Sequence, residues 1–295
     1  ISDEDIQSEI QRIERREDLP EKSAADGDRG GGRYINVIPD VDFETIETVI
    51  PLSYRREPHL DYAELVRGPA TRLRRFLQDL GSRYEAIPRR LQGTRLARPL
   101  LKRLVIQRDP RVLVARERRV VNDLFISIVI DCSGSMEYAD NMERAKRFAM
   151  LVAEAARGVS NIDVRLFGFT DDRIYDAGSA DRPAVPALNA GGGNNDAAAL
   201  WHACRVAMMS GRKAKLVVMI SDGLPTECSV AALRALVQRV THRLHICCAQ
   251  AAVQPITEEC FDHYVLLDDG DMETSVREFG TLIAGLIRRA MQTGQ

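Results

Sequence analysis

A chain of 295 residues, of which 45% are hydrophobic, has enough material to bury one large core or two modest ones. No apolar run approaches the roughly 20 residues that a membrane-spanning helix needs. No signal peptide opens the chain, and its start at Ile1 is that expected of a fragment of a longer protein. The six cysteines form no C-x-x-C pair and no disulfide-like spacing, so we expect reduced thiols and a cytoplasmic protein.

The near-zero net charge of −2 hides a strong division along the chain. Residues 1–66 hold 8 Lys or Arg against 17 Asp or Glu, whereas residues 67–119 hold 16 against 4. The remaining residues hold 17 against 22. An acidic N-terminal region, a basic region and a mildly acidic region therefore follow one another.

Residues 1–33 are charged and end in a run rich in glycine, a composition that cannot offset the entropy lost on ordering. We therefore predict an acidic, disordered linker there. The stretch from Tyr34 to Tyr54 alternates apolar and acidic residues, and we interpret it either as a strand or as a docking peptide. Its role stays open at this point.

Apolar residues recur at helical spacing between Asp61 and Gly81, with arginines between them, which predicts an amphipathic helix. These residues are Leu65, Leu73, Phe76, Leu77 and Leu80. A second basic segment at residues 95–104 has a similar character and precedes a turn at residues 108–111. We therefore predict that residues 34–122 form an extended segment and a basic helical arm.

The basic region could also bind nucleic acid, because 16 Lys or Arg in 53 residues would give a salt-sensitive contact with phosphates. Against this, the region has few aromatic residues beyond Phe76 and Tyr84. The acidic N-terminal region could also neutralise it within the chain or in a neighbouring subunit. A helical docking surface is the favoured interpretation.

After Asp123 the pattern changes to strands and helices in alternation. We predict strands at residues 124–130, 162–169, 215–220, 244–249 and 264–267, and helices at residues 141–157, 196–209, 231–243 and 273–291. Near-continuous apolar strands that alternate with helices are typical of a mainly parallel sheet covered on both faces. Residues 123–295 are thus predicted to form a doubly wound α/β domain.

Ligands of such sheets bind at the carboxyl ends of the strands, where the strand order reverses. Three polar clusters fall at these positions, at residues 131–136, 191–196 and 221–226. The hydroxyls of Ser133 and Ser135 and the carboxylates of Asp131 and Asp222 suit Mg²⁺, with Mn²⁺ or Ca²⁺ as substitutes. Since these ligands carry only two formal negative charges, we expect the ion to accept one further anion.

Other interpretations of these residues are weaker. Asp131, Ser133 and Ser135 alone could cap a helix N-terminus, but the coincidence of three loops argues for a site. Phosphatases of related topology carry Asp-x-Asp, whereas this chain has Ser133 at the second Asp position. An α/β-hydrolase is not expected because no serine lies in a Gly-x-Ser-x-Gly motif with a plausible triad. The glycines from Gly191 to Gly193 are not followed by the lysine of a Walker phosphate-binding loop. We therefore expect no catalytic site and no ATPase activity.

Two further groups invite a chemical interpretation. Cys132 lies beside the first cluster but has no adjacent His, so we interpret it as a packing residue rather than a nucleophile. His242 is predicted on a helix and His245 and Cys247 on a strand that leads away from it, so a shared zinc site is not expected.

The three polar clusters at the strand ends resemble the metal-ion-dependent adhesion site of von Willebrand factor A (VWA) domains. The resemblance rests on Asp131-x-Ser133-x-Ser135, the glycine-rich second loop and Asp222-Gly223, and it covers roughly residues 124–290. The family commonly has Thr in the second loop, where this chain has Asn194. The side-chain carbonyl of Asn194 could replace the Thr hydroxyl as a neutral oxygen ligand. Alternatively, Asp196 could be the ligand, as its position resembles the second loop of the cobaltochelatase large subunit. The resemblance therefore leaves Asn194 and Asp196 as alternative ligands.

Within this superfamily the chain is similar to bacterial proteins that act with MoxR-type AAA+ ATPases. Asp-x-Ser-Gly-Ser-Met, Gly168-Phe169-Thr170 and Ser221-Asp222-Gly223-x-Pro225 follow an arginine-rich segment, as in nitric-oxide reductase activators, the rubisco-activase adaptor and a cobaltochelatase subunit. The resemblance implies a non-catalytic adaptor whose metal captures an acidic side chain of the ATPase or of a client protein. A subunit of a cobalt or magnesium chelatase is the alternative.

Overall fold

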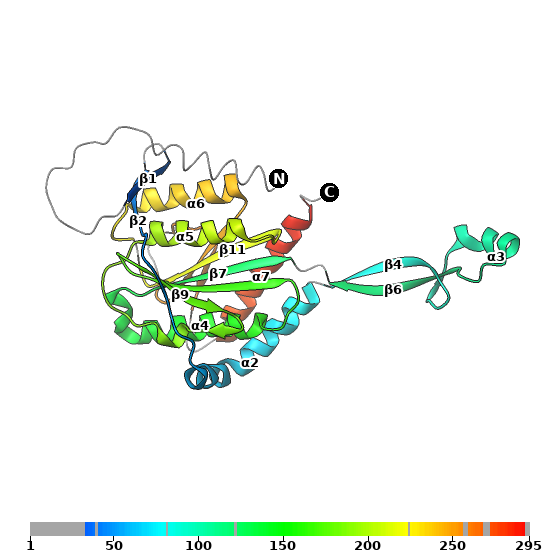
Figure 1. Cartoon of the computed structure of the whole chain (residues 1–295), viewed down its shortest axis with the longest axis horizontal. Coiled ribbons are helices and arrows are strands. Elements are labelled where there is room, and N and C mark those ends of the chain that lie inside the picture. The colour runs from blue at the N-terminus through cyan, green and yellow to red at the C-terminus, as the bar shows by residue number, and fades with distance from the viewer. Residues whose placement is uncertain are drawn as a thin grey trace.

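The computed structural model describes residues 33–38, 41–80, 82–120, 123–223, 225–255, 259–267 and 272–292. The linker predicted for residues 1–33 lies outside these ranges, except for Arg33. Within them, no helix combines the length and the apolar character that crossing a membrane requires. Figure 1 shows an α/β domain from which a long, narrow arm projects.

Eight strands form the central sheet, in the order β10-β9-β8-β7-β11-β12-β13, with β3 paired to β9. Their bounds are β3 Val49–Pro51, β7 Leu124–Asp131, β8 Ile162–Phe169, β9 Ile174–Ser179, β10 Arg182–Pro183, β11 Ala214–Ser221, β12 Cys247–Ala252 and β13 Tyr264–Leu266. The five neighbouring strands β8-β7-β11-β12-β13 are all parallel to one another. At the edge beside β8, β9 pairs antiparallel with β8, and β10 pairs antiparallel with β9. The chain leaves β7 for β8 on one side and later returns to β11 on the other, so the strand order reverses at β7.

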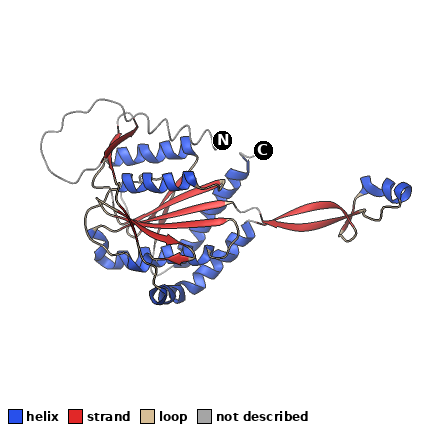
Figure 2. Ribbon diagram, viewed as in Figure 1, coloured by secondary structure: helices blue, strands red, loops and turns tan. Residues whose placement is uncertain are grey.

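Helices cover both faces of this sheet, as Figure 2 shows. Their bounds are α2 Arg56–Leu80, α4 Asn141–Ala156, α5 Asp196–Met209, α6 Val230–Leu244 and α7 Met272–Gln292. In β7, Leu124, Ile126, Ile128 and Ile130 join the core that contains α2, α4 and α7. Phe125 and Val129, on the opposite side of the strand, join the core that contains α5 and α6. The predicted doubly wound, mainly parallel α/β fold is confirmed.

Helix α2 begins at Arg56, before the predicted start at Asp61. Pro58 lies in its first turn, where the missing amide hydrogen costs no helical hydrogen bond. Leu73 and Leu77 are fully buried in the same core as β7. The helix therefore packs as part of the α/β domain, although it precedes residue 123, where the domain was predicted to start.

The prediction of a basic helical arm is confirmed only in part. The helix predicted from Asp61 lies within α2, and the second predicted segment, residues 95–104, is helical from Arg98 onward, but residues 82–120 are largely a β-hairpin. β4 (Ser82–Arg90) pairs antiparallel with β6 (Leu113–Val120), and the short strand β5 (Arg95–Leu96) also pairs with β6. Only its end is helical, in the 3-10 turn η2 (Arg98–Leu100) and helix α3 (Leu101–Gln107). Ser82 pairs with Val120, so each strand of the hairpin depends on a partner that is distant in sequence. Local periodicity does not reveal such pairing, and the sequence pattern therefore did not predict these strands. We call residues 82–120 the hairpin arm.

The described residues between Tyr34 and Tyr54 include three strands, so the strand interpretation is the correct one. β1 (Arg33–Ile38) pairs antiparallel with β2 (Val41–Thr45), and β3 extends the central sheet by pairing parallel to β9. Phe43 of β2 is buried in the core that contains α5 and α6. The segment therefore belongs to the domain.

The strand predicted at residues 244–249 begins later, at Cys247. Helix α6 continues to Leu244, and His245 ends it with a φ of +53°, in the left-handed conformation common after a helix. The prediction of this strand was wrong at its start because the apolar run of strand β12 follows the helix with almost no polar interval.

Candidate metal centre

Three loops meet at the carboxyl ends of β7 and β11, beside the point where the strand order reverses. The first follows β7 and carries Asp131, Ser133 and Ser135, and the third follows β11 and carries Asp222. The second loop leads into α5 and carries Asn194 and Asp196. Interactions between these side chains bring all six predicted residues into one site.

A chain of hydrogen bonds joins the first loop to the third. The backbone amide of Ser133 donates to Asp131 Oδ1 over 2.8 Å, and the hydroxyls of Ser133 and Ser135 lie 3.0 Å apart. The Ser135 hydroxyl donates to Asp222 Oδ1 over 3.0 Å, and Asn141 Nδ2 donates to Asp222 Oδ2 over 3.4 Å. Hydroxyl and carboxylate oxygens from two loops therefore form one continuous group.

Backbone hydrogen bonds hold the second loop against the first. The amide of Gly191 donates to Cys132 O over 2.7 Å, and the amide of Gly134 donates to Gly192 O over 3.0 Å. Gly192 has a φ of +99°, and a Cβ on Gly193 would lie only 3.1 Å from Asp171 Cβ. Glycine is therefore needed here both for a backbone conformation and for a close approach of two loops.

The two candidate ligands of the second loop have different surroundings. Asn194 Oδ1 accepts hydrogen bonds from the Thr226 amide over 3.0 Å and from the Thr226 hydroxyl over 2.5 Å. The Asn194 side chain also lowers the pKa of Asp131. Asp196, by contrast, is buried, and its Oδ2 has no hydrogen-bond partner among the described residues. The available oxygen in the second loop thus belongs to Asp196, whereas Asn194 ties the loops together.

Burial and mutual repulsion perturb the carboxyls of the site. Burial raises the pKa of Asp131 from 3.8 to about 6, the charge of Asp222 adds to this, and hydrogen bonds from Ser133 and Asn194 oppose it. Burial raises the pKa of Asp196 to about 8, and the charges of Asp131 and Asp222 raise it further. Asp131 Oδ2, like Asp196 Oδ2, is buried and has no hydrogen-bond partner among the residues that the structure describes. A cation would offset the cost of holding these charges together.

The donors present fit a hard divalent cation. They are carboxylate and hydroxyl oxygens, which are the ligands that Mg²⁺ and Ca²⁺ take in proteins. Within the part of the chain that the structure describes, no three His, Cys, Asp or Glu side chains are grouped closely enough to hold an ion by themselves. A ligand set here would therefore also include neutral oxygens, and the nearest candidates are the hydroxyls of Ser133 and Ser135 and the amide oxygen of Asn194.

Cys132 lies beneath the first loop and faces the core. The thiol is fully buried, and burial together with the charge of Asp131 raises its pKa to about 12. A Cβ added at Gly168 on the neighbouring strand would lie 2.9 Å from Cys132 Sγ, which shows how tightly the sulfur is packed. A thiol that remains protonated is a poor nucleophile, so Cys132 acts in packing.

Asn141 and Asn195 support the site and were not singled out from the sequence. Asn141 begins α4 and is fully buried, and its contact to Asp222 links that helix to the third loop. Asn195 caps α5 by accepting from the Ala198 amide over 3.1 Å, and its Nδ2 donates to Glu44 O of β2 over 2.8 Å. The run of Asn and Asp before α5 was a usable signal for the cap, since these residues are favoured at helix N-termini.

No protein-family model matches the chain, and no curated protein matches it. Solved structures that resemble it include the D319A mutant of the PilB minor pilin from Streptococcus sanguinis, with 11% identity over 59% of this chain and 64% of the pilin, at a TM-score of 0.47. A von Willebrand factor type A protein from Catenulispora acidiphila has 19% identity over 55% of this chain and 42% of that one, at a TM-score of 0.41. BatB from Bacteroides thetaiotaomicron has 16% identity over 57% of this chain and 99% of that one, at a TM-score of 0.35.

The chain thus spans less than two thirds of the length of the first two of these structures. All three TM-scores lie below 0.5, so the α/β assignment of this chain rests on its own strand order and on its two helical layers. VWA domains occur among the structural neighbours.

Proposed function

We propose that this chain is a non-catalytic adaptor that binds Mg²⁺ and, through the ion, a carboxylate of a partner protein. The observation that carries the proposal is the pair of buried, unpartnered oxygens, Asp131 Oδ2 and Asp196 Oδ2, beside the linked hydroxyls of Ser133 and Ser135. Such a group of oxygens is costly without a cation and suits a hard one.

In this proposal Ser133 and Ser135 ligate the ion through their hydroxyls. Asp131, Asp196 and Asp222 supply negative charge, directly or through water, and Mn²⁺ or Ca²⁺ are possible substitutes. When bound, the ion supplies a Lewis-acidic position for one more anionic ligand. Direct ligation by Asp196 would tighten metal binding and would weaken the demand of the ion for a partner carboxylate.

The proposed metal ligands differ in exposure, which favours the approach of a partner from the side of Ser135 and Asp222. Ser135 is exposed and Asp222 is partly exposed, whereas Asp131 and Asp196 are buried. Glu137 and Tyr138 follow Ser135 in the same loop and are exposed. We propose that these two residues, with Asp171 beside the second loop, select among partner carboxylates.

The partner that we propose is a MoxR-type AAA+ ATPase, with a client protein as the object of its mechanical work. The support is the similarity of the first and third loops to those of MoxR-associated adaptors. In this arrangement the chain contributes recognition, and the ATPase contributes the energy of ATP hydrolysis.

Calorimetric titration of the purified chain with Mg²⁺ tests the metal site. The wild-type chain is expected to bind one ion, and Asp131→Ala is expected to abolish binding without unfolding the domain, as judged by circular dichroism. Asp163→Ala is a matched control, because this exposed carboxylate pairs with Arg212 at the start of β8, the opposite end of the sheet from the site. Loss of Mg²⁺ binding in the control would overturn the assignment of the site.

A pull-down of a purified MoxR-type ATPase tests the partner. We expect capture in Mg²⁺, loss of capture in EDTA, and loss of capture by the Asp131→Ala chain. A complex that survives both EDTA and Asp131→Ala would exclude carboxylate capture by the metal.

A further inference from the structure

The end of the hairpin arm exposes many apolar side chains. We call residues 91–112 the arm tip. Val105 is 80% exposed and Ile106 is 77% exposed, and Leu91, Leu96 and Leu104 are also exposed. The tip has only a small interior, formed around Ala97 and Val112, whose backbones pair over 2.8 Å.

The same tip is strongly basic. It holds six Lys or Arg and one acidic residue, Asp109, which pairs with Arg111. The exposed basic residues are Arg95, Arg98, Lys102, Arg108 and Arg111. Single exposed apolar residues need no explanation, but a cluster of them rimmed by charge marks an interaction surface. Its partner should be acidic and should carry apolar side chains.

The N-terminal residues of this chain have that chemistry. Residues 1–32 hold ten Asp or Glu against five Lys or Arg. Ile6, Ile10 and Ile13 follow one another at spacings of four and three, so a segment predicted to be disordered on its own would present an apolar stripe among acidic neighbours on folding into a helix when it binds. We propose that the arm tip binds residues 1–32 of a second copy of this chain.

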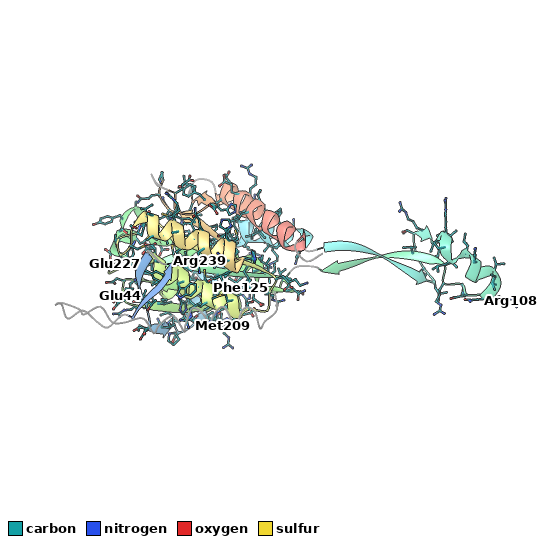
Figure 3. All side chains as sticks on the ribbon, turned by 90° about the horizontal axis from the view of Figure 1, so that it is seen from above. Glu44, Arg108, Phe125, Met209, Glu227 and Arg239 are labelled. Carbon is teal, nitrogen blue, oxygen red and sulfur yellow. The ribbon has the colours of Figure 1, made fainter. Side chains whose placement is uncertain are left out.

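The position of residue 33 favours a second copy over the same one. Arg33 begins β1, whose partner β2 lies at the metal end of the sheet, where Glu44 O accepts from Asn195 Nδ2. The hairpin arm leaves the opposite end, because β6 leads to the first residue of β7. Figure 3 shows Glu44 on the domain and Arg108 at the far end of the arm.

The distance along the molecule makes an internal contact costly. β7 has 8 residues and β4 has 9, which together span about 55 Å before the arm tip begins. The 20 residues from Ile13 to Arg33 span at most about 70 Å when fully extended. An internal contact would therefore stretch this segment almost completely and order its backbone, whereas a second copy can bring its own segment to the tip.

Binding of this kind is head-to-tail. Each copy would offer its tip to one neighbour and its N-terminal segment to another, an arrangement that closes into a ring or extends into a filament.

Sedimentation velocity on the full chain tests the proposal. We expect the wild type to assemble with rising concentration at about 0.05 M NaCl and to dissociate at about 0.5 M, because salt screens exposed charges. Val105→Asp/Ile106→Asp in the tip and Ile6→Asp/Ile10→Asp in the segment should each sediment as monomers. Met209→Asp replaces an equally exposed apolar residue on α5 and should assemble as the wild type does.

Mixing the two double variants separates a second copy from an internal contact. One variant retains an intact tip and the other an intact segment, so an equimolar mixture should form a dimer that cannot extend further. A mixture that stays monomeric would overturn the proposal, and so would a tip variant that still assembles. Tip-dependent binding to phosphatidylserine vesicles or to duplex DNA by a wild type that remains monomeric would also overturn it.

Discussion

Ser135 and Asp222 lie 87 positions apart in the chain, and the Ser135 hydroxyl donates to Asp222 Oδ1 over 3.0 Å. This contact joins the loops that follow the two central strands, β7 and β11. Because Ser135 is exposed, its hydroxyl can be removed with little effect on packing.

Ser135→Ala is therefore expected to weaken Mg²⁺ binding by about tenfold or more, the cost typical of losing a group that ligates or orients in a metal site. The midpoint of thermal unfolding in EDTA should stay within about 2 °C of the wild-type value. Calorimetric titration and a thermal melt measure the two effects. Ser160→Ala removes an exposed hydroxyl after α4, at the other end of the sheet, and should change neither quantity.

Asp196→Asn tests which residue of the second loop serves the metal. Burial, with the charges of Asp131 and Asp222, raises the pKa of Asp196 to about 8, so the folded metal-free protein must protonate this carboxyl or hold it charged, whereas the amide is neutral at every pH. We expect the metal-free variant to melt about 2–6 °C above the wild type and its Mg²⁺ affinity to fall. Thermal melts with and without Mg²⁺ give both results.

Asn194→Ala is the companion variant, and it should destabilise the protein with or without Mg²⁺, because Thr226 loses two hydrogen bonds. If Asn194→Ala alone abolished metal binding while Asp196→Asn left the Mg²⁺ affinity unchanged, the ligand would be Asn194.

Local pattern was sufficient to predict that three loops meet, because each follows an apolar strand or opens a helix. It could not decide between Asn194 and Asp196. That distinction depends on Thr226, which is 32 positions from Asn194 and occupies its carbonyl oxygen. A ligand assignment of this kind requires the packing of two loops, which sequence spacing does not contain.

The strands that local pattern missed are those that depend on their neighbours. β9 contains Asp176 and Gly178 among few apolar residues, and its pairing with β8 and β3 stabilises it. The hairpin arm is similar, since Ser82 and Val120 pair at its base and the whole arm separates them in sequence. The central strands were predictable because burial on both faces requires nearly continuous apolar sequence.

Leu73→Ala tests whether α2 belongs to the core of the domain. Leu73 is fully buried with β7 and α4, so the variant should lower the free energy of unfolding by about 2–5 kcal/mol. Leu65→Ala on the same helix is the control, because Leu65 is 66% exposed and its loss should cost about 0.5 kcal/mol or less. Urea unfolding measures both, and equal effects of the two variants would contradict the packing of α2.

The carboxyls of the metal centre predict how stability depends on pH. An unfolded Asp titrates near pH 3.9, whereas burial raises the pKa of Asp131 to about 6 and that of Asp196 to about 8. Between about pH 4 and pH 8 the folded, metal-free protein therefore binds more protons than the unfolded chain. Its free energy of unfolding should fall as pH rises through this window, since stability decreases with pH wherever the folded state holds the extra protons.

Mg²⁺ should flatten this dependence, because the ion binds the deprotonated carboxylates and displaces their protons. We expect the rise in melting temperature on adding Mg²⁺ to be small at pH 5 and to grow up to about pH 8. Melts in EDTA and in excess Mg²⁺ at each pH measure it, and Asp196→Asn should flatten the upper part of the profile. A rise that is the same at pH 5 and pH 8 would show that the ion does not compete with protons for Asp131 and Asp196, and would place the metal elsewhere.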